Sequence, residues 1–323
     1  MSSIDVTDPT RRPFSGRRVH LGDLLLQTVA GLAALVSTLL VGLIAWKVID
    51  GARPSISAFG LGFVTHIGWD PVKGSFGAGS FLAGTAITSL CALVLAAPLA
   101  LGIALFLTEL APRAIRAPVT ALVETLAAIP SVVIGLWGIL VLGPILRDHV
   151  EPFLHSTLGF IPLFGTPGSA APSVFTAVIV LTIMILPIVS SISRELFLGV
   201  PHELKEAALG LGTTRWEMVR GVMFPYARGG IAAALILGLG RAVGEAIAVT
   251  QVIGGYVGVQ WNLFSPGDTL ASKIASEYQG APTSLDAASL IYLALILLVF
   301  SLIVNLLAQW VVRRVSRRQG LTR

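Results

Sequence analysis

The sequence predicts an all-α integral membrane protein with six transmembrane helices, and three observations support this prediction. Hydrophobic residues occupy 54% of the 323 positions and charged residues only 12%, whereas an average soluble domain is about 25% charged. Six long stretches are apolar with few charges, and about 20 such residues are enough to cross the hydrocarbon core of a bilayer. Arginine and lysine are concentrated in the segments on one side of these stretches, as in multi-pass membrane proteins.

The predicted spans follow one another in the order 24–46, 81–108, 117–146, 170–193, 229–254 and 287–312. Most of them contain no charged residue. The exceptions are the third span, which contains Glu124, and the fifth, which contains Arg241 and Glu245. Because charge inside a bilayer is energetically costly and usually functional, these three residues are the candidates for a substrate path.

The basic residues orient the spans. The segments 1–20, 109–116, 194–228 and 313–323 share one side and carry most of the arginines and lysines. The opposite side carries only Lys47, Arg53, Lys73, Arg147 and Lys273. Cytoplasmic loops are the basic ones, so we expect both termini to be cytoplasmic.

This topology predicts a simple domain organisation. A cytoplasmic tail at 1–20 precedes a transmembrane domain at 21–312, and a basic cytoplasmic tail follows at 313–323. The first tail contains Arg11, Arg12, Arg17 and Arg18. We interpret the basic tail at 313–323 as an anchor to an anionic leaflet, and we expect no nucleic-acid partner.

Several other classes of protein and site are not expected. The first apolar run is too long for the core of a signal peptide and lacks a small-residue cleavage site, so we predict a retained span. A single cysteine, Cys91, can form neither an intrachain disulfide nor a metal site. We expect no catalytic residue, no metal and no cofactor bound by this chain.

The segment 198–226 is too polar to span a membrane and predicts two short helices. Pro201 suits a first helical turn, and Gly210 and Gly212 end the first helix. An apolar stripe at helical spacing consists of Leu204, Ala207, Ala208 and Leu211. Thr214 and Glu217 have the spacing of a capping box that starts the second helix, and Pro225 is expected to stop it.

Two interpretations of this segment stay open on physical grounds. It can be an amphipathic hairpin resting on the bilayer, or it can be a docking element for a soluble partner. Docking is favoured by the small residues Ala207, Ala208 and Gly212, which allow close approach. Charge complementarity is offered by Glu203, Glu206, Arg215 and Glu217.

Arg241 and Glu245 are four residues apart in the fifth span, which separates them by about 40° on a helical wheel, within reach of an ion pair. Small residues at 234, 238 and 248 fall on the same face, and Gly240 and Gly244 form a small-xxx-small step beside it. One interpretation is a neutralised pair that holds two helices together. The other is a substrate path in which the guanidinium of Arg241 contacts an oxyanion.

Glu245 is an unusual neighbour for an anion, and two uses remain open. It can hold Arg241 until the substrate displaces it, or it can accept a hydrogen bond from a protonated oxyanion. Phosphate carries such a proton near neutral pH and sulfate does not. Glu124 can also line the path, or it can be solvated near the cytoplasmic end of its span.

The stretch "EAALGLGTTRWEMVRGVMFP", residues 206–225, resembles the EAA loop of permeases of ABC importers. Val222 and Phe224 replace the more usual isoleucine and leucine of that motif. The resemblance implies a coupling helix, with Glu203, Glu206, Ala207, Ala208 and Gly212, that seats in a groove on a cytoplasmic ATPase. This chain has no phosphate-binding loop of the G-x-x-x-x-G-K-[ST] type, so ATP and Mg²⁺ would be bound by a separate subunit.

The stretch "GLGRAVGEAIAV", residues 238–249, resembles the fifth span of the PstC family of phosphate-specific ABC permeases, and the likeness extends over about 56–312. It implies a type I ABC importer permease fold in a bacterial plasma membrane, with no enzymatic activity of its own. It also implies four associations: a second, PstA-like permease, a PstB-like ATPase homodimer, an extracytoplasmic PstS-like binding protein, and inorganic phosphate. Arg241 and Glu245 stand where this family places charged residues essential for transport.

Two other classes remain as alternatives. The first is an ABC permease for another oxyanion, such as sulfate or molybdate. The second is an ATP-independent anion carrier, for which discontinuous helices or inverted repeats are typical; the sequence shows neither.

Overall fold

The computed structural model describes residues 21–317 and divides the chain into two compact units, residues 1–47 and 48–323. The predicted tail at 1–20, with its four arginines, and residues 318–323 of the predicted basic tail lie outside the described residues. Among the described residues, six helices are long and apolar enough to cross a membrane, as predicted. They are Gly22–Phe59, Gly79–Leu110, Ser131–Leu158, Val174–Leu198, Arg215–Gly244 and Ser284–Arg314.

The first of these, α1 (Leu21–Phe59), is continuous, and its residues up to Lys47 form the described part of the first unit. The rest of α1 belongs to the second unit. There Ser55 is buried and its hydroxyl lies 3.1 Å from that of Ser289 in α14 (Ser284–Arg317).

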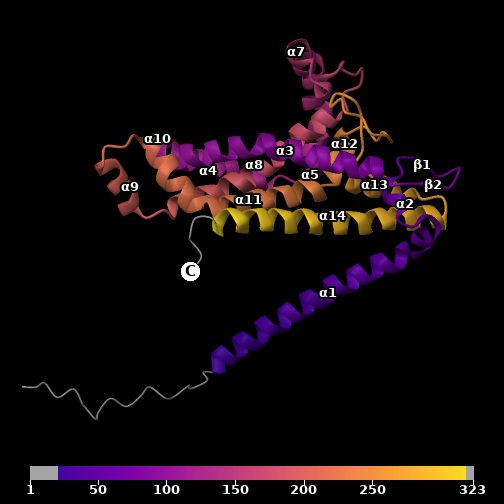
Figure 1. Ribbon diagram of the computed structural model, residues 1–323, viewed down its shortest axis with the longest axis horizontal. Helices are drawn as coiled ribbons and strands as arrows, with labels where there is room; N and C mark the ends of the chain where they lie inside the picture. Colours follow the sequence, from indigo (N-terminus) through magenta and orange to yellow (C-terminus); the bar gives the residue numbers. More distant parts are fainter. Residues whose placement is uncertain (1–20, 318–323) are drawn as a thin grey trace, which may run out of the picture. The chain divides into compact units, whose positions relative to one another are not determined.

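Long helices lying side by side form the second unit (Figure 1). They are α3 (Gly79–Leu105), α8 (Val174–Leu198), α11 (Phe224–Gly244) and α14. The most buried span is α8, which contacts both α3 and α11. Every fourth residue of α3 facing it is a fully buried alanine, at positions 92, 96, 100 and 104. Such a row lets two helix backbones approach closely, which explains the central place of α8.

The bounds predicted for the third span, 117–146, are wrong. Ile129 has an extended backbone before Pro130 and divides the region into α4 (Arg113–Ala128) and α5 (Ser131–Trp137), because a residue that precedes proline resists helical angles. The membrane-spanning helix therefore begins at Ser131 and continues to Leu158, into the region predicted as a loop. Its later parts are α6 (Gly143–Ile145) and α7 (Glu151–Leu158), with π turns between the segments.

Four π-helical turns each end two residues before a proline. The turns are η1 (Phe106–Leu110), η2 (Gly138–Leu142), η3 (Leu146–Val150) and η5 (Val219–Met223), and the prolines are Pro112, Pro144, Pro152 and Pro225. Proline lacks an N–H and its ring collides with the preceding turn of an α-helix. A wider turn relieves that collision, so the chain stays helical through Pro144, Pro152 and Pro225, whereas the helix ends after η1 because Ala111 is extended and Pro112 is not helical.

The second short helix predicted in the segment 198–226 shows this effect of a π turn before a proline. The capping box of Thr214 and Glu217 is confirmed and starts α10 (Arg215–Met218). The predicted stop near Pro225 is wrong, because η5 carries the helix past the proline into α11. The preceding helix, α9 (His202–Gly210), ends before Gly212, whose φ of +85° suits glycine.

The predicted fifth span, 229–254, is also interrupted. The helix α11 ends at Gly244, and α12 (Ile247–Val252) begins after a break at Glu245 and Ala246. Both breaks in predicted spans, at Pro130 and at Glu245, were invisible to periodicity because the residues around them are apolar or small.

Short elements build the end of the second unit opposite to α9 (Figure 1). They are α2 (Gly62–Thr65), the antiparallel strands β1 (Trp69–Asp70) and β2 (Ser75–Phe76), α13 (Leu270–Glu277), and the 3-10 turn η6 (Tyr278–Gly280). A further 3-10 turn, η4 (Pro162–Phe164), packs against α7. Trp69 pairs with Phe76 across the strands and packs edge-on against Phe81 of α3. This aromatic cluster joins the short elements to the helix bundle.

Candidate functional site

Arg241 and Glu245 form an ion pair across the break between α11 and α12. Nη2 of Arg241 lies 3.6 Å from Oε2 of Glu245. Glu245 has an extended backbone, and its Oε1 accepts a hydrogen bond of 3.3 Å from the backbone N–H of Ala248, in the first turn of α12. A carboxylate at a helix N-terminus is stabilised by the helix dipole. Glu245 therefore caps α12 and contacts Arg241 at once, and the pair does not lie along one continuous helix face as predicted.

The two side chains differ in exposure. The side chain of Glu245 is 8% exposed, whereas that of Arg241 is 44% exposed. Arg241 belongs to an exposed stripe of α11 and α12 that also contains Ala233, Leu237, Gly244 and Ile247. The guanidinium thus projects from a surface that the second unit leaves uncovered, with Glu245 behind it.

The small residues near the pair serve packing. A Cβ atom on Gly238 would lie 2.7 Å from Cγ2 of Ile185 and 2.9 Å from Cγ2 of Val189, so glycine lets α11 approach α8. Gly244 has no such neighbour, and a Cβ on Gly240 would come no closer than 3.9 Å to Asn305. The prediction that Ala234, Gly238 and Ala248 share a face with Arg241 is wrong, because these small residues are buried against the chain's own core whereas Arg241 is exposed.

An open space does lie beside Arg241, on the side of the α4–α5 junction. A cavity of about 160 Å³ is lined by Leu126, Ala127, Ile129, Ile134, Met184, Ile188 and Arg241. Arg241 is its sole charged lining residue among the residues that the structure covers. A mostly apolar pocket with one fork-shaped cation is suited to a partly desolvated oxyanion. The break at Pro130, which the sequence analysis did not detect, thus creates part of this site.

Glu124 lies elsewhere. It is on α4, outside the membrane-spanning helices, and lines a separate pocket with Arg113, Arg116 and Arg194. The structure therefore does not bring Glu124 to Arg241, and the expectation of a carboxylate inside the third span is wrong.

The predicted coupling residues of α9 divide into two groups. Glu203, Glu206, Ala207 and Gly212 are exposed. Ala208 is half-buried against a core cluster that contains Phe197 and Met218, so it fixes α9 to the bundle. The predicted apolar stripe is not a buried face, since Leu204 and Leu211 are 45% and 85% exposed.

Exposed apolar residues surround the turn after α9. Leu211 and Trp216, which is 65% exposed, flank this turn. The sequence pattern predicts Leu211 on an apolar stripe of this segment and assigns no role to Trp216. Their exposure at a polar end of the chain is typical of a protein interface.

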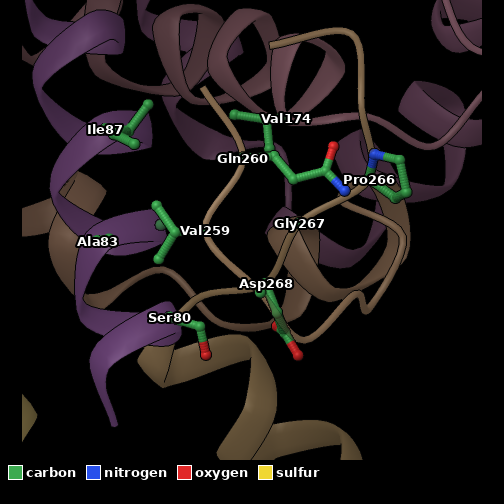
Figure 2. A pocket seen from close by; sticks show the side chains of 11 residues that line it. Ser80, Ala83, Ile87, Val174, Val259, Gln260, Pro266, Gly267 and Asp268 are labelled. Atoms are coloured by element: carbon green, nitrogen blue, oxygen red, sulfur yellow. The ribbon is translucent and has the colours of Figure 1, made fainter. Parts of the chain in front are cut away.

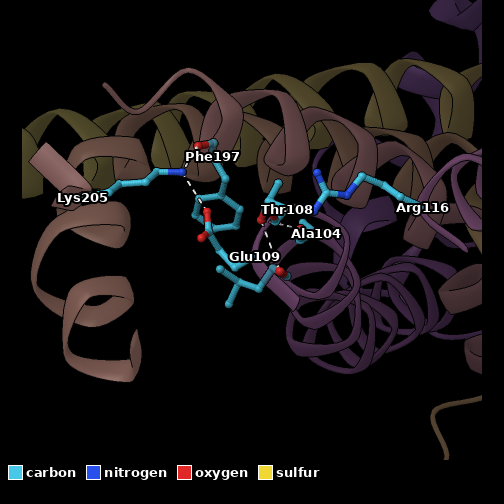
Figure 3. A network of polar contacts seen from close by, with 7 residues as sticks. Ala104, Thr108, Glu109, Arg116, Phe197 and Lys205 are labelled. Carbon is cyan, nitrogen blue, oxygen red and sulfur yellow. Dashed lines mark hydrogen bonds and ion pairs between the residues drawn. The ribbon is translucent and has the colours of Figure 1, made fainter. Parts of the chain in front are cut away.

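A largely buried ion pair connects α9 to the end of the second span. Nζ of Lys205 donates to Oε1 of Glu109 in η1 at 2.7 Å, and also to the carbonyl oxygen of Phe197 at 3.4 Å (Figure 3). The side chains of Lys205 and Glu109 are 14% and 21% exposed. Because the partners are 96 positions apart, no local pattern could reveal this contact.

A buried carboxyl group lies at the opposite end of the bundle. Asp268 lies beside Ser80 of α3 and near Val259, which belongs to the same loop between α12 and α13 (Figure 2). A Cβ atom on Gly84 would lie 2.0 Å from the carbonyl oxygen of Asp268, so the loop presses directly on α3. Burial raises the pKa of Asp268 from 3.8 to about 6, although hydrogen bonds from Ser272 and the Thr269 backbone act in the opposite direction.

This raised pKa makes the loop's stability pH-dependent. Between pH 3.8 and about 6 the folded loop binds a proton that the unfolded chain does not, so stability falls as pH rises through this window and is constant above it. The loss is about 3 kcal/mol. We expect Asp268→Asn to remove most of this dependence, measured by hydrogen exchange of the Tyr256 amide, which bonds to the Gly267 carbonyl. An unchanged pH profile in the variant would assign the dependence to other groups.

Comparison with known proteins places this architecture in one class. The family model described as "Binding-protein-dependent transport system inner membrane component" matches residues 96–317. A chain of a bacterial alginate ABC transporter, solved with an alginate pentasaccharide-bound periplasmic protein, is 18% identical with a TM-score of 0.58, covering 92% of this chain and 98% of that chain. A chain of the inward-facing MetNI methionine ABC transporter is 19% identical with a TM-score of 0.50, covering 73% and 93%. The chain has the fold of type I ABC importer permeases, which are multi-pass inner-membrane proteins.

Curated relatives narrow the class. The chain is 40% identical over 304 residues to the phosphate transport system permease protein PstC of Pasteurella multocida (strain Pm70), covering 93% of this chain and 95% of the relative. It is 41% identical to PstC of Mesorhizobium japonicum, covering 99% and 100%, and 40% identical to PstC 2 of Mycobacterium tuberculosis (strain ATCC 25618 / H37Rv), covering 94% and 97%. The chain belongs to the PstC family of phosphate transport system permeases.

Proposed function

We propose that this chain is the permease subunit of an ATP-driven phosphate importer and forms half of the translocation pathway. The observation that carries this proposal is Arg241, a half-exposed guanidinium in an apolar cavity of a membrane helix. An intramembrane cation cannot stably face lipid, so its exposed side requires a water-filled path or another protein. A guanidinium matches the geometry of phosphate oxygens, and membership of the PstC family agrees with phosphate as the substrate.

The proposed partners are inferred from the surfaces that the described part of the chain leaves exposed. The exposed stripe around Arg241 would face a PstA-like second permease, and the exposed residues of α9 would face a PstB-like ATPase homodimer that holds ATP and Mg²⁺. A PstS-like protein would deliver phosphate at the end that carries β1 and β2. This arrangement puts α9 and both termini in the cytoplasm, as the distribution of basic residues predicts.

The mechanism couples movement of α9 to the helices around Arg241. ATP binding and hydrolysis would displace the ATPase surface on which α9 is seated. Lys205 and Ala208 connect α9 to η1 and to the core cluster at the end of α8. Their displacement would shift α3 and α8 against α11, so that Arg241 faces one side of the membrane and then the other.

A transport assay tests this function. The complex is reconstituted in vesicles loaded with ATP, with the binding protein outside, and uptake of phosphate, sulfate and molybdate is compared. We expect ATP-dependent uptake of phosphate alone. Preferential uptake of sulfate or molybdate would instead identify a permease for another oxyanion, and uptake without ATP would identify a carrier. The helix breaks at Pro130 and Glu245 do not by themselves favour a carrier, because family membership supports an ABC permease independently of them.

Glu245 is proposed as a positioning residue for Arg241. One carboxylate oxygen caps α12 and the other lies at Arg241, so both are engaged before substrate arrives. We expect Glu245→Gln to lower phosphate uptake by about tenfold, as for loss of one charged partner, and to leave the preference for phosphate over sulfate intact. Loss of that preference would support the other use, in which Glu245 accepts the proton-bearing oxygen of phosphate.

The ion pair of Lys205 and Glu109 is proposed to transmit force from α9. We expect Glu109→Gln to reduce uptake by about 30-fold or more, since breaking a largely buried charge pair costs about 2 kcal/mol or more, while ATP hydrolysis is less affected. The exchange Glu109→Lys with Lys205→Glu should recover much of the uptake. Asp148→Asn, which removes a partly exposed pair with Arg147, is the matched control. Equal loss of hydrolysis and uptake in Glu109→Gln would contradict a transmitting role.

A further inference from the structure

The second pocket along α4 is the strongest unassigned feature of the described structure. It has a volume of about 410 Å³ and is lined by Arg113, Arg116, Ala117, Thr120, Ala121, Glu124 and Arg194. Its lining contains three guanidinium groups and one carboxylate, so it is net positive. Arg113 and Glu124 are exposed, whereas Arg116 and Arg194 are partly buried.

Several donors in this pocket have no protein partner. Within the described part of the chain, Nε of Arg116, Nε of Arg194 and the hydroxyl of Thr120 are buried and make no hydrogen bond. Arg116 is nevertheless held in place, because its Nη2 donates to the carbonyl oxygens of Thr108 and Ala111, each at 3.2 Å (Figure 3). Arg194 is held by Glu195 at 2.7 Å. Buried polar groups are normally paired, so fixed but unpaired donors indicate a place for a ligand with acceptor oxygens.

The pocket continues the cavity at Arg241 along the same pair of helices. The Arg241 cavity is lined by Leu126 of α4 and Ile188 of α8, and the second pocket by Thr120 and Arg194 of the same helices. On each helix the step is six residues toward the end that carries α9, which is about 9 Å at 1.5 Å per residue. The two cavities therefore lie one after the other along the interface between α4 and α8.

We infer that the pocket of Arg113, Arg116, Thr120 and Arg194 is a second oxyanion site, which receives inorganic phosphate after it leaves Arg241 and before it enters the cytoplasm. This inference rests on the proposed function for its place in the path. Three guanidinium groups attract the anion. Glu124 keeps the attraction moderate, as a transit site requires, because an ion must also leave. Glu124 thereby belongs to the path, although it is distant from Arg241.

A local chemical reporter tests this site without requiring transport. The chain has a single cysteine, so Cys91→Ala with Ala121→Cys places one thiol on the exposed wall of the pocket. The rate of its modification by a charged thiol reagent is measured in the assembled complex, with inorganic phosphate or with chloride at equal ionic strength. At ten times its dissociation constant, phosphate should slow the reaction about tenfold, and Ala117→Cys, at another exposed residue of the pocket lining, provides a second reporter.

Variants decide whether the pocket itself binds phosphate. Arg194→Gln should abolish the protection, whereas Arg220→Gln, an exposed arginine at the same end outside this pocket, should not. Protection should persist in an Arg241→Ala background, which separates this site from the proposed function: parental uptake by Arg241→Ala together with retained protection would contradict only the proposed function. Absence of protection by phosphate in both reporters overturns the inference. Two lipids are also compared without added phosphate. Protection by phosphatidylglycerol vesicles but not by phosphatidylcholine vesicles would overturn the inference, because the pocket would then bind a lipid headgroup.

Discussion

Arg241→Ala abolishes ATP-driven phosphate uptake by the reconstituted complex, with a fall of about 100-fold or more. A bidentate guanidinium contributes two charge-assisted hydrogen bonds to an oxyanion, each of about 1.5–3 kcal/mol. In this chain the loss is not compensated locally, because every other residue lining the Arg241 cavity in the described structure is apolar. Arg241→Lys keeps a charge but loses the fork, so we expect an intermediate loss of about tenfold.

The variant needs a control for folding, since Arg241→Ala also leaves the buried carboxylate of Glu245 without its partner. The pair Arg241→Ala with Glu245→Ala removes both charges, and co-purification of the ATPase measures assembly in each case. We expect assembled complexes that do not transport. Uptake near the parental rate in assembled Arg241→Ala would show that the pair only holds α11 and α12 together.

The sequence predicted the number of spans correctly because composition alone distinguishes apolar helices from polar connections. It could not locate where two of them break. Pro130 interrupts a continuous apolar run, whereas Pro225 does not interrupt its helix, since a π turn absorbs it. The same residue type therefore has opposite outcomes at the two positions, and hydropathy does not distinguish them.

The candidate site was predicted in part. Charge in an apolar segment identified Arg241 and Glu245, but their geometry was wrong, because the helix-wheel argument assumed continuity through Glu245. Glu124 was assigned to a span that the structure does not form. Contacts between segments that are distant in the sequence, such as that of Lys205 with Glu109, leave no periodic signal. Only the structure reveals them.

Leu211→Asp separates the permease from its ATPase. Leu211 is 85% exposed beside the positive-φ turn at Gly212, and Trp216 is exposed on α10, which follows that turn. Apolar anchors at the centre of an interface each contribute about 2 kcal/mol or more, so placing a carboxylate there should weaken docking by a factor of about 30 or more. Co-purification of the ATPase and ATP-dependent uptake should both be lost.

Leu61→Asp is the matched control, because Leu61 is also 85% exposed but lies at the end of the bundle with β1 and β2. The same substitution at equal exposure there should leave the ATPase bound. If Leu211→Asp retains the ATPase at the parental ratio, then α9 does not dock it, and the exposed leucine instead fits the alternative in which this hairpin rests on the bilayer. Because Ala208 and Lys205 already fix α9 to the bundle, loss of docking in Leu211→Asp would reflect the exposed surface and not unfolding of the helix.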